Sequence, residues 1–497
     1  MKKILVSGLV AMSLALSSCG DYLDINDSPN SPSGSNVSED LIFPGTEMCF
    51  ATCYSDFLRI PSGYFAQQYA QMFGTANYLD YSRFKQSAAL SSRMYTTLST
   101  GTLQNLSTVI AKSEASGSNG NILAATVLRA ASYQALVDVY GAIPYSEALN
   151  PDNITPKYDD GKDIYAGLIK ELDDAKAKCL GTEKVCTNFL LPGARADKWI
   201  QVANALKLRL LMRESKAVDV KAQLDALIAE DNFPTEDVAW AGCWANESGH
   251  ANPFYQEEFA TYFGSTQSNV VLNLSLFAAM NVADDARLKA WFNPNTDKKE
   301  YTGGVSSTNF ATTKSYKAGY WCRPNVKYDD PVVLISVAEI KFFLSEYEAR
   351  YGSAAKAKEY YEAAIEASFE GAGVSGAEKV LEVYPYDNAK YAECIGIQKW
   401  VALAGINPFE AYCEMRRLGY PTFGSVTGEQ IYNELNDTFN PSLLVPGTLY
   451  TPLFVNADLG SNKVLQRWPY PEASSNRNEN APEFLNTDYG KPIFWAE

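Results

Sequence analysis

Histidine is almost missing from this chain, because His250 is the only one among 497 residues. Ser-His-Asp and Cys-His active sites, and most zinc sites, need histidine side chains, so any such site would have to include His250. That residue lies in the polar stretch 247–253 (ESGHANP), which is typical of a surface loop. The sequence also lacks a CxxC pair, a P-loop, a GxSxG motif and a GxGxxG motif that follows a strand. We therefore expect no catalytic residues of these classes, no bound metal and no cofactor.

The chain also lacks a surplus of positive charge. It carries 42 Lys and Arg residues against 58 Asp and Glu residues, which gives a formal net charge of -16. Proteins that bind nucleic acids present basic patches to the phosphates, and attachment to anionic lipid headgroups uses clusters of Lys and Arg. The composition therefore argues against a nucleic-acid partner and against a polybasic membrane anchor.

Long apolar runs are missing beyond the N-terminus, where no stretch approaches the roughly 18 residues that indicate a membrane span. The N-terminus begins with Lys2 and Lys3 and continues with the apolar segment 4–16. A charged start, about 7–15 apolar residues and small residues at their end describe a secretory signal. We expect residues 1–18 to be a signal peptide.

Cys19 follows this apolar segment in the sequence LSSC, residues 16–19. This order resembles the bacterial lipobox, in which the chain is cut before the cysteine and the thiol is acylated. The alternative is ordinary secretion, with a cysteine at this place by chance. Residues 26–38 (NDSPNSPSGSNVS) have too little apolar surface to pack and favour a flexible spacer. We therefore predict a lipidated N-terminus and flexible tether over residues 19–38, with Cys19 as the lipidation site.

Eight further cysteines follow Cys19. The pairs Cys49/Cys53 and Cys179/Cys186 are close enough in sequence to form local disulfides in an oxidising compartment. The alternative is that these cysteines are small buried hydrophobic residues, and we favour this interpretation for most of them.

Helical periodicity dominates the rest of the chain. Apolar residues recur at helix spacing most clearly in 121–140, a segment followed by Gly141, which suits a helix C-terminus. The other predicted helices are 164–180, 197–213 with Asp197 as a candidate N-cap, 221–230, 332–351, 354–369, 391–404 and 407–418, with a shorter one near 272–280.

Two places have the residue spacing of tetratricopeptide helix pairs, in which small residues let paired helices approach closely and aromatics fill the gaps. The residues that fit the first helix of a repeat are Trp199, Val202, Ala203 and Leu206. The residues that fit the second helix are Ala357, Tyr361 and Ala364, with Ser345 at the small position of the preceding helix. Ordinary antiparallel helix packing is the alternative reading of each match alone.

The predicted fold is mostly α, with a tetratricopeptide-like helical-pair scaffold and a loop-rich, irregular part packed against it. Residues 39–497 are expected to form a single domain. Its scaffold falls mainly in 39–230 and 331–419. The segments 231–330 and 420–497 are too long and too rich in Gly, Asn, Ser, Thr and Pro to be simple connectors, and ligand sites often lie on such loops.

Several segments, taken in order, resemble the SusD/RagB family of nutrient-binding lipoproteins, nearest its SusD-like members. They are 128–130, 137–148, 164–165, 171–173, 199–213, 338–346, 398–400, 407–412, 416–417 and 467–472, with Asn476. No single motif is decisive. Together they cover essentially the whole chain after the lipobox.

The resemblance implies a mostly α-helical fold in which four tetratricopeptide-like helix pairs form a scaffold for a loop-rich ligand site. It also implies a lipoprotein anchored in the outer membrane at the cell surface, without catalysis. Such proteins bind an oligosaccharide, or sometimes a peptide, and act as the lid of a SusC-like TonB-dependent β-barrel transporter. Most of the matching motifs, including Arg416, Arg417 and the segment 467–472, are expected to be structural.

Aromatic rings on loops are the informative candidates for a glycan site, because sugars stack on aromatic faces and form hydrogen bonds to polar side chains. The predicted ligand-binding residues are Asn77, Tyr78, Tyr81, Trp291, Tyr320, Trp321 and Arg323. The alternative is that these aromatics anchor loops onto the helices, which a 12% aromatic content makes common.

Two other functions compete with nutrient binding. A surface-anchored glycoside hydrolase would need a pair of carboxylates, but 58 acidic residues make such pairs inevitable and so uninformative. A helical-repeat scaffold that holds other proteins is the remaining alternative.

Overall fold

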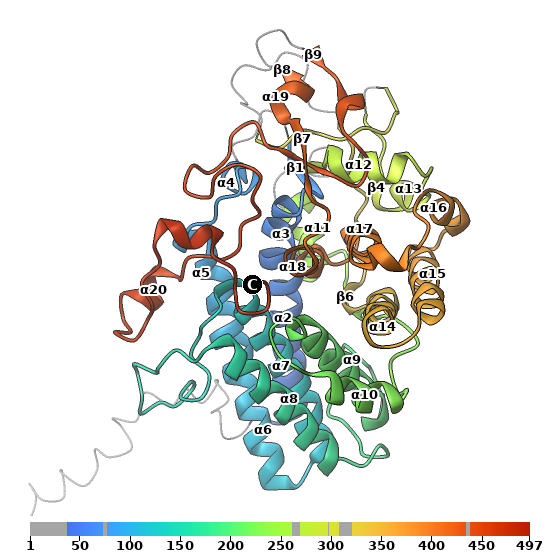
Figure 1. The fold of residues 1–497 in the computed structure, drawn as a ribbon. Helices are drawn as coiled ribbons and strands as arrows, with labels where there is room; N and C mark the ends of the chain where they lie inside the picture. The colour runs from blue at the N-terminus through green and yellow to red at the C-terminus, as the bar shows by residue number, and fades with distance from the viewer. Residues whose placement is uncertain (1–36, 73–76, 261–268, 297, 308–320, 434–437) are drawn as a thin grey trace, which may run out of the picture.

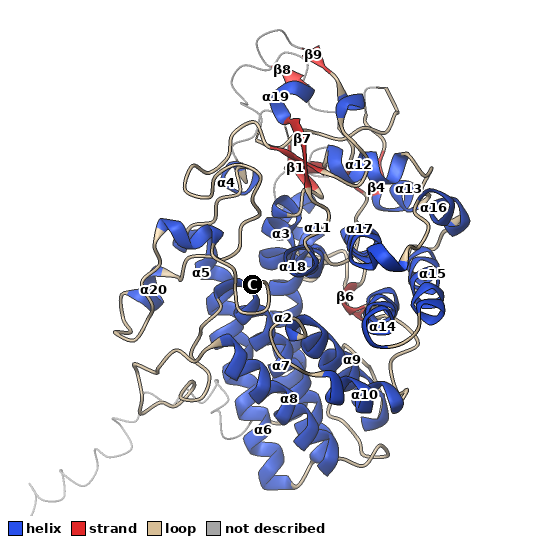
Figure 2. Cartoon of the chain, viewed as in Figure 1, coloured by secondary structure: helices blue, strands red, loops and turns tan. Residues whose placement is uncertain are grey.

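Helices form most of the described chain, and its strands are short (Figure 2). The computed structural model describes residues 37–72, 77–260, 269–296, 298–307, 321–433 and 438–497. The α-helices are α2 (Glu39–Thr52), α3 (Arg59–Phe65), α4 (Leu79–Ser82), α5 (Ala88–Thr96), α6 (Gln104–Ser116), α7 (Asn119–Tyr140), α8 (Gly161–Lys178), α9 (Ala196–Glu214), α10 (Lys221–Ala229), α11 (Pro253–Tyr255), α12 (Leu274–Asn281), α13 (Arg287–Trp291), α14 (Val337–Tyr351), α15 (Ala354–Gly371), α16 (Ala377–Val383), α17 (Tyr391–Ala404), α18 (Pro408–Leu418), α19 (Gly428–Ile431) and α20 (Glu472–Ser475). Shorter turns are the π-helical η1 (Cys53–Leu58), η2 (Thr97–Leu103) and η3 (Gln256–Ala260), and the 3-10 turns η5 (Asn388–Lys390), η6 (Pro441–Leu443) and η7 (Asn486–Gly490).

The helices α6 to α9 lie side by side in the lower half of Figure 1, with α7 in contact with each of the others. Helix α7 is buried along almost its whole length and ends at Gly141, whose φ of 85° is a conformation that glycine adopts easily. By length and composition, α7 is the one helix of the described residues that could cross a membrane. Because most of it lies inside the protein, its apolar character is that of a core helix.

A second set of helices, α14, α15 and α17, lies on the right of Figure 1. Helices α14 and α15 pack closely against each other along their length. The Ser345 hydroxyl donates a 2.7 Å hydrogen bond to the Ala357 carbonyl, and Tyr361 is fully buried between neighbouring helices. These contacts confirm the predicted helix pair, because small residues at the crossing let the two helices approach.

The helix expected over 332–351 is shorter than predicted. Its first four residues form strand β6 (Val332–Ile335), which pairs antiparallel with β2 (Val238–Trp240). The helix begins only after Ser336, whose hydroxyl accepts a hydrogen bond from the Glu339 backbone. A run of β-branched residues suits a strand, and the partner strand that uses it lies about a hundred residues earlier. Asp197 is also not an N-cap, because Arg195 holds that position and Asp197 lies in the first turn of α9.

Two-stranded ladders organise the loop-rich part, and several of their strands lie at the top of Figure 1, whereas α20 and the C-terminus lie lower. Strand β1 (Tyr69–Gln71) pairs antiparallel with β3 (Val270–Leu272). The other pairs are β4 (Phe292–Asn293) with β5 (Arg323–Pro324), β7 (Phe423–Thr427) with β10 (Leu449–Thr451), and β8 (Tyr432–Asn433) with β9 (Thr438–Phe439). These ladders bring segments from distant parts of the sequence together around β1.

The eight cysteines after Cys19 all carry free thiols, so neither Cys49/Cys53 nor Cys179/Cys186 forms a disulfide. Cys53, Cys179, Cys186, Cys322 and Cys413 are buried. Their burial agrees with the interpretation of most cysteines as small hydrophobic core residues.

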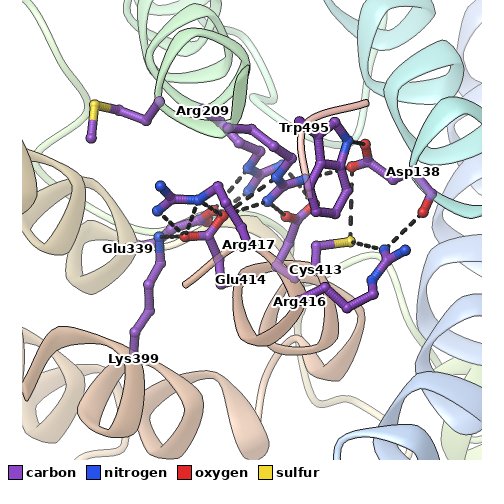
Figure 3. Close-up of polar contacts among 12 residues, drawn as sticks. Asp138, Arg209, Glu339, Lys399, Cys413, Glu414, Arg416, Arg417 and Trp495 are labelled. Atoms are coloured by element: carbon purple, nitrogen blue, oxygen red, sulfur yellow. Dashed lines mark hydrogen bonds and ion pairs between the residues drawn. The ribbon is translucent and has the colours of Figure 1, made fainter. Parts of the chain in front are cut away.

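A buried network of ion pairs joins α7, α9, α14, α17 and α18 (Figure 3). Arg213 links several of these pairs, because it contacts Asp138 at 2.5 Å, Glu414 at 3.1 Å and also Glu410. Burial opposes the ionisation of Glu410, but Arg209 and Arg213 prevail and lower its pKa to about 2. The charges are therefore retained inside the protein because each carboxylate has a cationic partner.

The two arginines of 416–417 have structural roles, as predicted, and Arg417 belongs to this network. Arg417 pairs with Glu346 at 2.5 Å and with Glu414 at 2.6 Å. Arg416 donates hydrogen bonds to the backbone carbonyls of Gln466 and Asp138. Both residues therefore fix the helices and the C-terminal segment in place. Further along, Arg467 donates to the Pro492 carbonyl and Tyr470 to the Ala142 carbonyl, which gives the segment 467–472 a structural role as well.

Candidate ligand-binding site

Tyr78 and its neighbours form an aromatic cluster at the start of α4. Tyr78 has a left-handed backbone with φ of 60°, which turns the chain into the helix. Its ring stacks on Tyr81, with 5.6 Å between ring centroids and 17° between planes, and also contacts Tyr64 at 5.9 Å. These contacts hold the Tyr78 ring in one orientation, so it is an ordered part of this edge of the molecule.

A polar group of side chains adjoins this cluster. Asn77 is exposed, and its amide donates to the Asn269 side chain at 3.3 Å. Glu258, on η3, accepts a 3.0 Å hydrogen bond from the Asn269 backbone. Burial, and then the Glu258 carboxylate that accepts its hydrogen bond, raise the pKa of Tyr78, so the phenol stays protonated and donates to Glu258. Asn77, Tyr78, Glu258 and Asn269 thus form one hydrogen-bonded group, which we call the rim; Asn77 and Tyr78 are its accessible members, whereas Glu258 and Asn269 are fully buried.

Two further carboxylates, Asp56 and Glu257, lie close to this rim, since both act on the Tyr78 phenol. Asp56, on the π-helical turn η1, is buried, and its pKa is raised by that burial and by Glu257, although Arg93 opposes the shift. π-Helical turns often occur at functional positions, and both η1 and η3 carry acidic residues here.

Tyr81 and Trp321 are buried, with 8% and 3% of their surface exposed. The Trp321 ring meets Phe439 edge-on at 5.4 Å and belongs to a small core with Ile431, Tyr432 and Tyr450. Both rings therefore anchor loops in this structure, as the alternative interpretation of loop aromatics expects. Direct sugar contact by these two rings stays a prediction, and Tyr320 lies outside the described residues.

The segment that precedes Asn77 and the segment that contains Trp321 both bond to strand β3. Tyr69 on β1 pairs with Leu272 on β3, and the backbone of Leu272 also donates to the Cys322 carbonyl at 2.8 Å. The segment that contains Trp321 and Arg323 is therefore tied to the strand pair that precedes Asn77. Arg323 is half-buried, and this burial lowers the pKa of its guanidinium.

Trp291 lies apart from the Tyr78 cluster, at the end of α13. Its ring packs directly on Gly405, where an added Cβ would lie 2.3 Å from a ring atom. Arg287 lies over the ring at 5.6 Å from the centroid. Trp291 lines a cavity of about 930 Å³, so the predicted residues divide between two places.

Sequence reasoning missed Glu258 and Asn269, because nothing around them has a motif and their neighbours in space come from 77–78. Among the residues that the structure describes, no group of three or more His, Cys, Asp or Glu side chains is arranged to hold a metal ion.

Residues 46–444 match the SusD-like_2 family model, described as "Starch-binding associating with outer membrane". The comparison with curated proteins gives no match.

Solved structures share the fold over nearly the whole chain. A SusD homologue from Bacteroides uniformis has 21% identity and a TM-score of 0.72, with 91% of this chain and 98% of that chain covered. A chitin-binding SusD homologue from Flavobacterium johnsoniae has 18% identity and a TM-score of 0.71, with the same two coverages of 91% and 98%. A SusD homologue from Bacteroides fragilis has 20% identity and a TM-score of 0.70, with coverages of 93% and 100%. At these identities the similarity shows a common fold.

Proposed function

The chain belongs to the SusD-like family, and from this premise we propose that it is a nutrient-binding lipoprotein of the outer membrane that captures an oligosaccharide. The family match over residues 46–444 is the observation that carries the proposal. The helical fold shared with solved SusD homologues supports it, and the chitin-binding relative favours glycans as the ligand class. The same role with a peptide ligand remains the alternative.

The rim around Tyr78 is the proposed place of first contact. Asn77 is exposed and Tyr78 is half-buried, so a sugar can reach the amide and the outer part of the ring. The ring is already held by Tyr81 and Tyr64, so binding costs little side-chain ordering. Tyr320, Trp321 and Arg323 remain proposed contacts of the later segments. Trp291 lies apart from this rim, and Gly405 covers one face of its ring, so we leave it out of the proposed sugar contacts.

Lipidation at Cys19 would hold the protein at the membrane, and residues 19–38 would let the domain move while it stays attached. The partner that we propose is a SusC-like TonB-dependent transporter, to which the captured glycan is delivered. Copurification of that transporter from solubilised outer membranes is the expected result, and recovery of the protein alone would contradict the proposed pairing.

Equilibrium binding of the mature domain to a panel of oligosaccharides tests the capture step. We expect at least one glycan to bind and Tyr78→Ala to weaken it about tenfold, which corresponds to roughly 1.4 kcal/mol. Tyr351→Ala is the matched control, since Tyr351 is a half-buried tyrosine at the end of α14. Full affinity in Tyr78→Ala would remove this residue from the site, and no binding by any glycan would contradict oligosaccharide capture.

The proposed role needs no catalysis. Incubation of the protein with each glycan that it binds is expected to leave the number of reducing ends unchanged. New reducing ends that appear in proportion to protein concentration would favour the glycoside hydrolase instead.

A further inference from the structure

The cavity beside Trp291 is separate from the rim around Tyr78. It lies between α14, α15, the end of α17 and the segments 231–241 and 324–331. The three helices are on the right side of Figure 1. Its volume of about 930 Å³ is within the range of roughly 300–1,000 Å³ that small-molecule sites occupy. Asn77 and Tyr78 are not part of its lining.

One part of the cavity lining is aliphatic, and we call this part the floor. The residues that form it include Val333, Val337, Ile340, Leu344 and Ala404. Trp291 is also part of the wall, but Gly405 covers one face of its ring. Sugars prefer open aromatic faces, whereas aliphatic side chains of a ligand gain from burial against an aliphatic surface. The floor therefore favours a ligand with apolar side chains over a sugar.

Negative charge gathers at one end of the cavity. The Asp237 carboxylate accepts a 2.8 Å hydrogen bond from the Val337 backbone at the start of α14, and its other oxygen lies beside Gly371. Glu370 precedes that glycine, and Asp231 and Glu236 come from the same segment as Asp237. Lys341, one turn further along α14, is the cation on this side. This end therefore carries four carboxylates against one ammonium group.

Positive charge lies at the other end, where α3 approaches the end of α17. The Arg59 guanidinium lies 4.5 Å from the centroid of the Phe254 ring and donates to the Gly405 carbonyl at 2.8 Å. Lys327 lies on the adjoining wall, and its backbone donates to Asp330, the one carboxylate of this end. Within the described parts of the chain, no side chain of the cavity lining takes part in an ion pair. The charges at both ends are thus not neutralised by an ion pair, although the Arg59 guanidinium also donates hydrogen bonds to Tyr69 and to the Ile406 carbonyl.

We propose that this cavity binds a short apolar oligopeptide with free termini. The amino group lies at the end formed by Asp237 and Glu370, the carboxylate lies at the end formed by Arg59 and Lys327, and the side chains cover the aliphatic floor. This site goes beyond the capture of oligosaccharide at the Tyr78 rim, because it differs from it in place and in ligand class.

Isothermal titration of the mature domain with the tetrapeptide Val-Leu-Ala-Leu tests the site. The free peptide is expected to bind, and either N-acetylation or C-amidation is expected to weaken it about fivefold, the scale of one solvent-accessible ion pair. Binding of the two capped peptides with the affinity of the free peptide would overturn the proposal, as would the absence of binding at millimolar concentration.

Two sets of variants test where the two termini of the peptide bind. Asp237→Asn with Glu370→Gln is expected to abolish the effect of N-acetylation, and Lys327→Met to reduce the effect of C-amidation. The matched controls are Glu366→Gln on α15 and Lys289→Met on α13, both exposed and outside the lining. Equal responses in variants and controls would overturn the assignment of the ends.

Glycan binding is measured separately, so the two proposals fail independently. Tyr78→Ala is expected to leave the affinity for the tetrapeptide unchanged. Displacement of the tetrapeptide by an oligosaccharide that binds at the Tyr78 rim would show that the cavity is not a separate site and would overturn this inference.

Discussion

Glu47 is a carboxyl group with no exposed surface, on helix α2. It accepts hydrogen bonds from the backbones of Phe189 at 2.6 Å and Leu190 at 3.1 Å. Burial raises its pKa to about 8, although these hydrogen bonds act in the opposite direction. At neutral pH the folded protein therefore holds a proton that the unfolded chain releases.

This raised pKa predicts a stability that depends on pH. The contribution is fully present below the ordinary pKa of about 4.5 and is lost as pH rises to about 8, because the unfolded chain binds fewer protons over that range. Glu47→Gln cannot ionise, so its free energy of unfolding should fall less than that of the parent between pH 5 and pH 8. Urea denaturation at both pH values measures the difference. Glu366→Gln, an exposed change, should keep the parental slope, and a parental slope in Glu47→Gln would refute the prediction.

Gly405 decides the position of the Trp291 ring. A Cβ at this position would lie 2.3 Å from a ring atom, so Gly405→Ala must push the indole away. We expect a loss of about 1–3 kcal/mol in the free energy of unfolding, the usual cost of overpacking. Gly45→Ala is the control, because Gly45 lies in α2 with open space around its Cβ position and should gain up to about 1 kcal/mol. Equal stability of Gly405→Ala and the parent would mean that Trp291 moves freely.

Between helices, the buried ion pairs provide contacts that apolar packing alone does not supply. Arg213 on α9 reaches Asp138 on α7 and both Glu410 and Glu414 on α18. Helices α7, α9 and α18 are therefore joined by buried charges, and each of these charges depends on a partner from another helix. The sequence shows the charged residues, but their partners lie far away along the chain, as with the 197 positions between Arg213 and Glu410.

Arg213→Met is expected to lower the free energy of unfolding by about 3–5 kcal/mol, because it leaves buried carboxylates without their cation. Lys170→Met removes a cation from the exposed pair with Asp174 on α8 and should cost no more than about 0.5 kcal/mol. Chemical denaturation compares the two variants. Similar losses in both would mean that the buried network contributes no more than a surface pair.

The element that sequence reasoning assigned wrongly is instructive. The sequence predicts a helix over 332–351, but residues 332–335 form β6 instead. A short apolar run is compatible with either state. Strand β2 decides between them, because its backbone pairs with Val332 and Val333.

For the whole molecule, the proposed lipidation of the N-terminal segment is tested at Cys19. Cys19→Ala should leave the protein unprocessed or release it from the membrane, because stable anchoring depends on acyl chains. The folded domain should bind its glycan with unchanged affinity. Membrane fractionation and equilibrium binding measure the two effects. Membrane association that survives the substitution would contradict lipidation at Cys19, and loss of binding would give this residue a role beyond anchoring.

The amino-acid sequence by itself determined the helical fold class, most helix positions and the family, because helix periodicity and motif order are properties of neighbouring residues. Helix α17 (Tyr391–Ala404) has the bounds that the sequence predicts. Tertiary structure alone decided which aromatic rings are buried, since Trp321 is covered by Phe439 from a segment more than a hundred residues later. Tertiary structure also brought together the charged residues that line the cavity beside Trp291. Burial and charge pairing depend on contacts between distant segments, which local spacing does not encode.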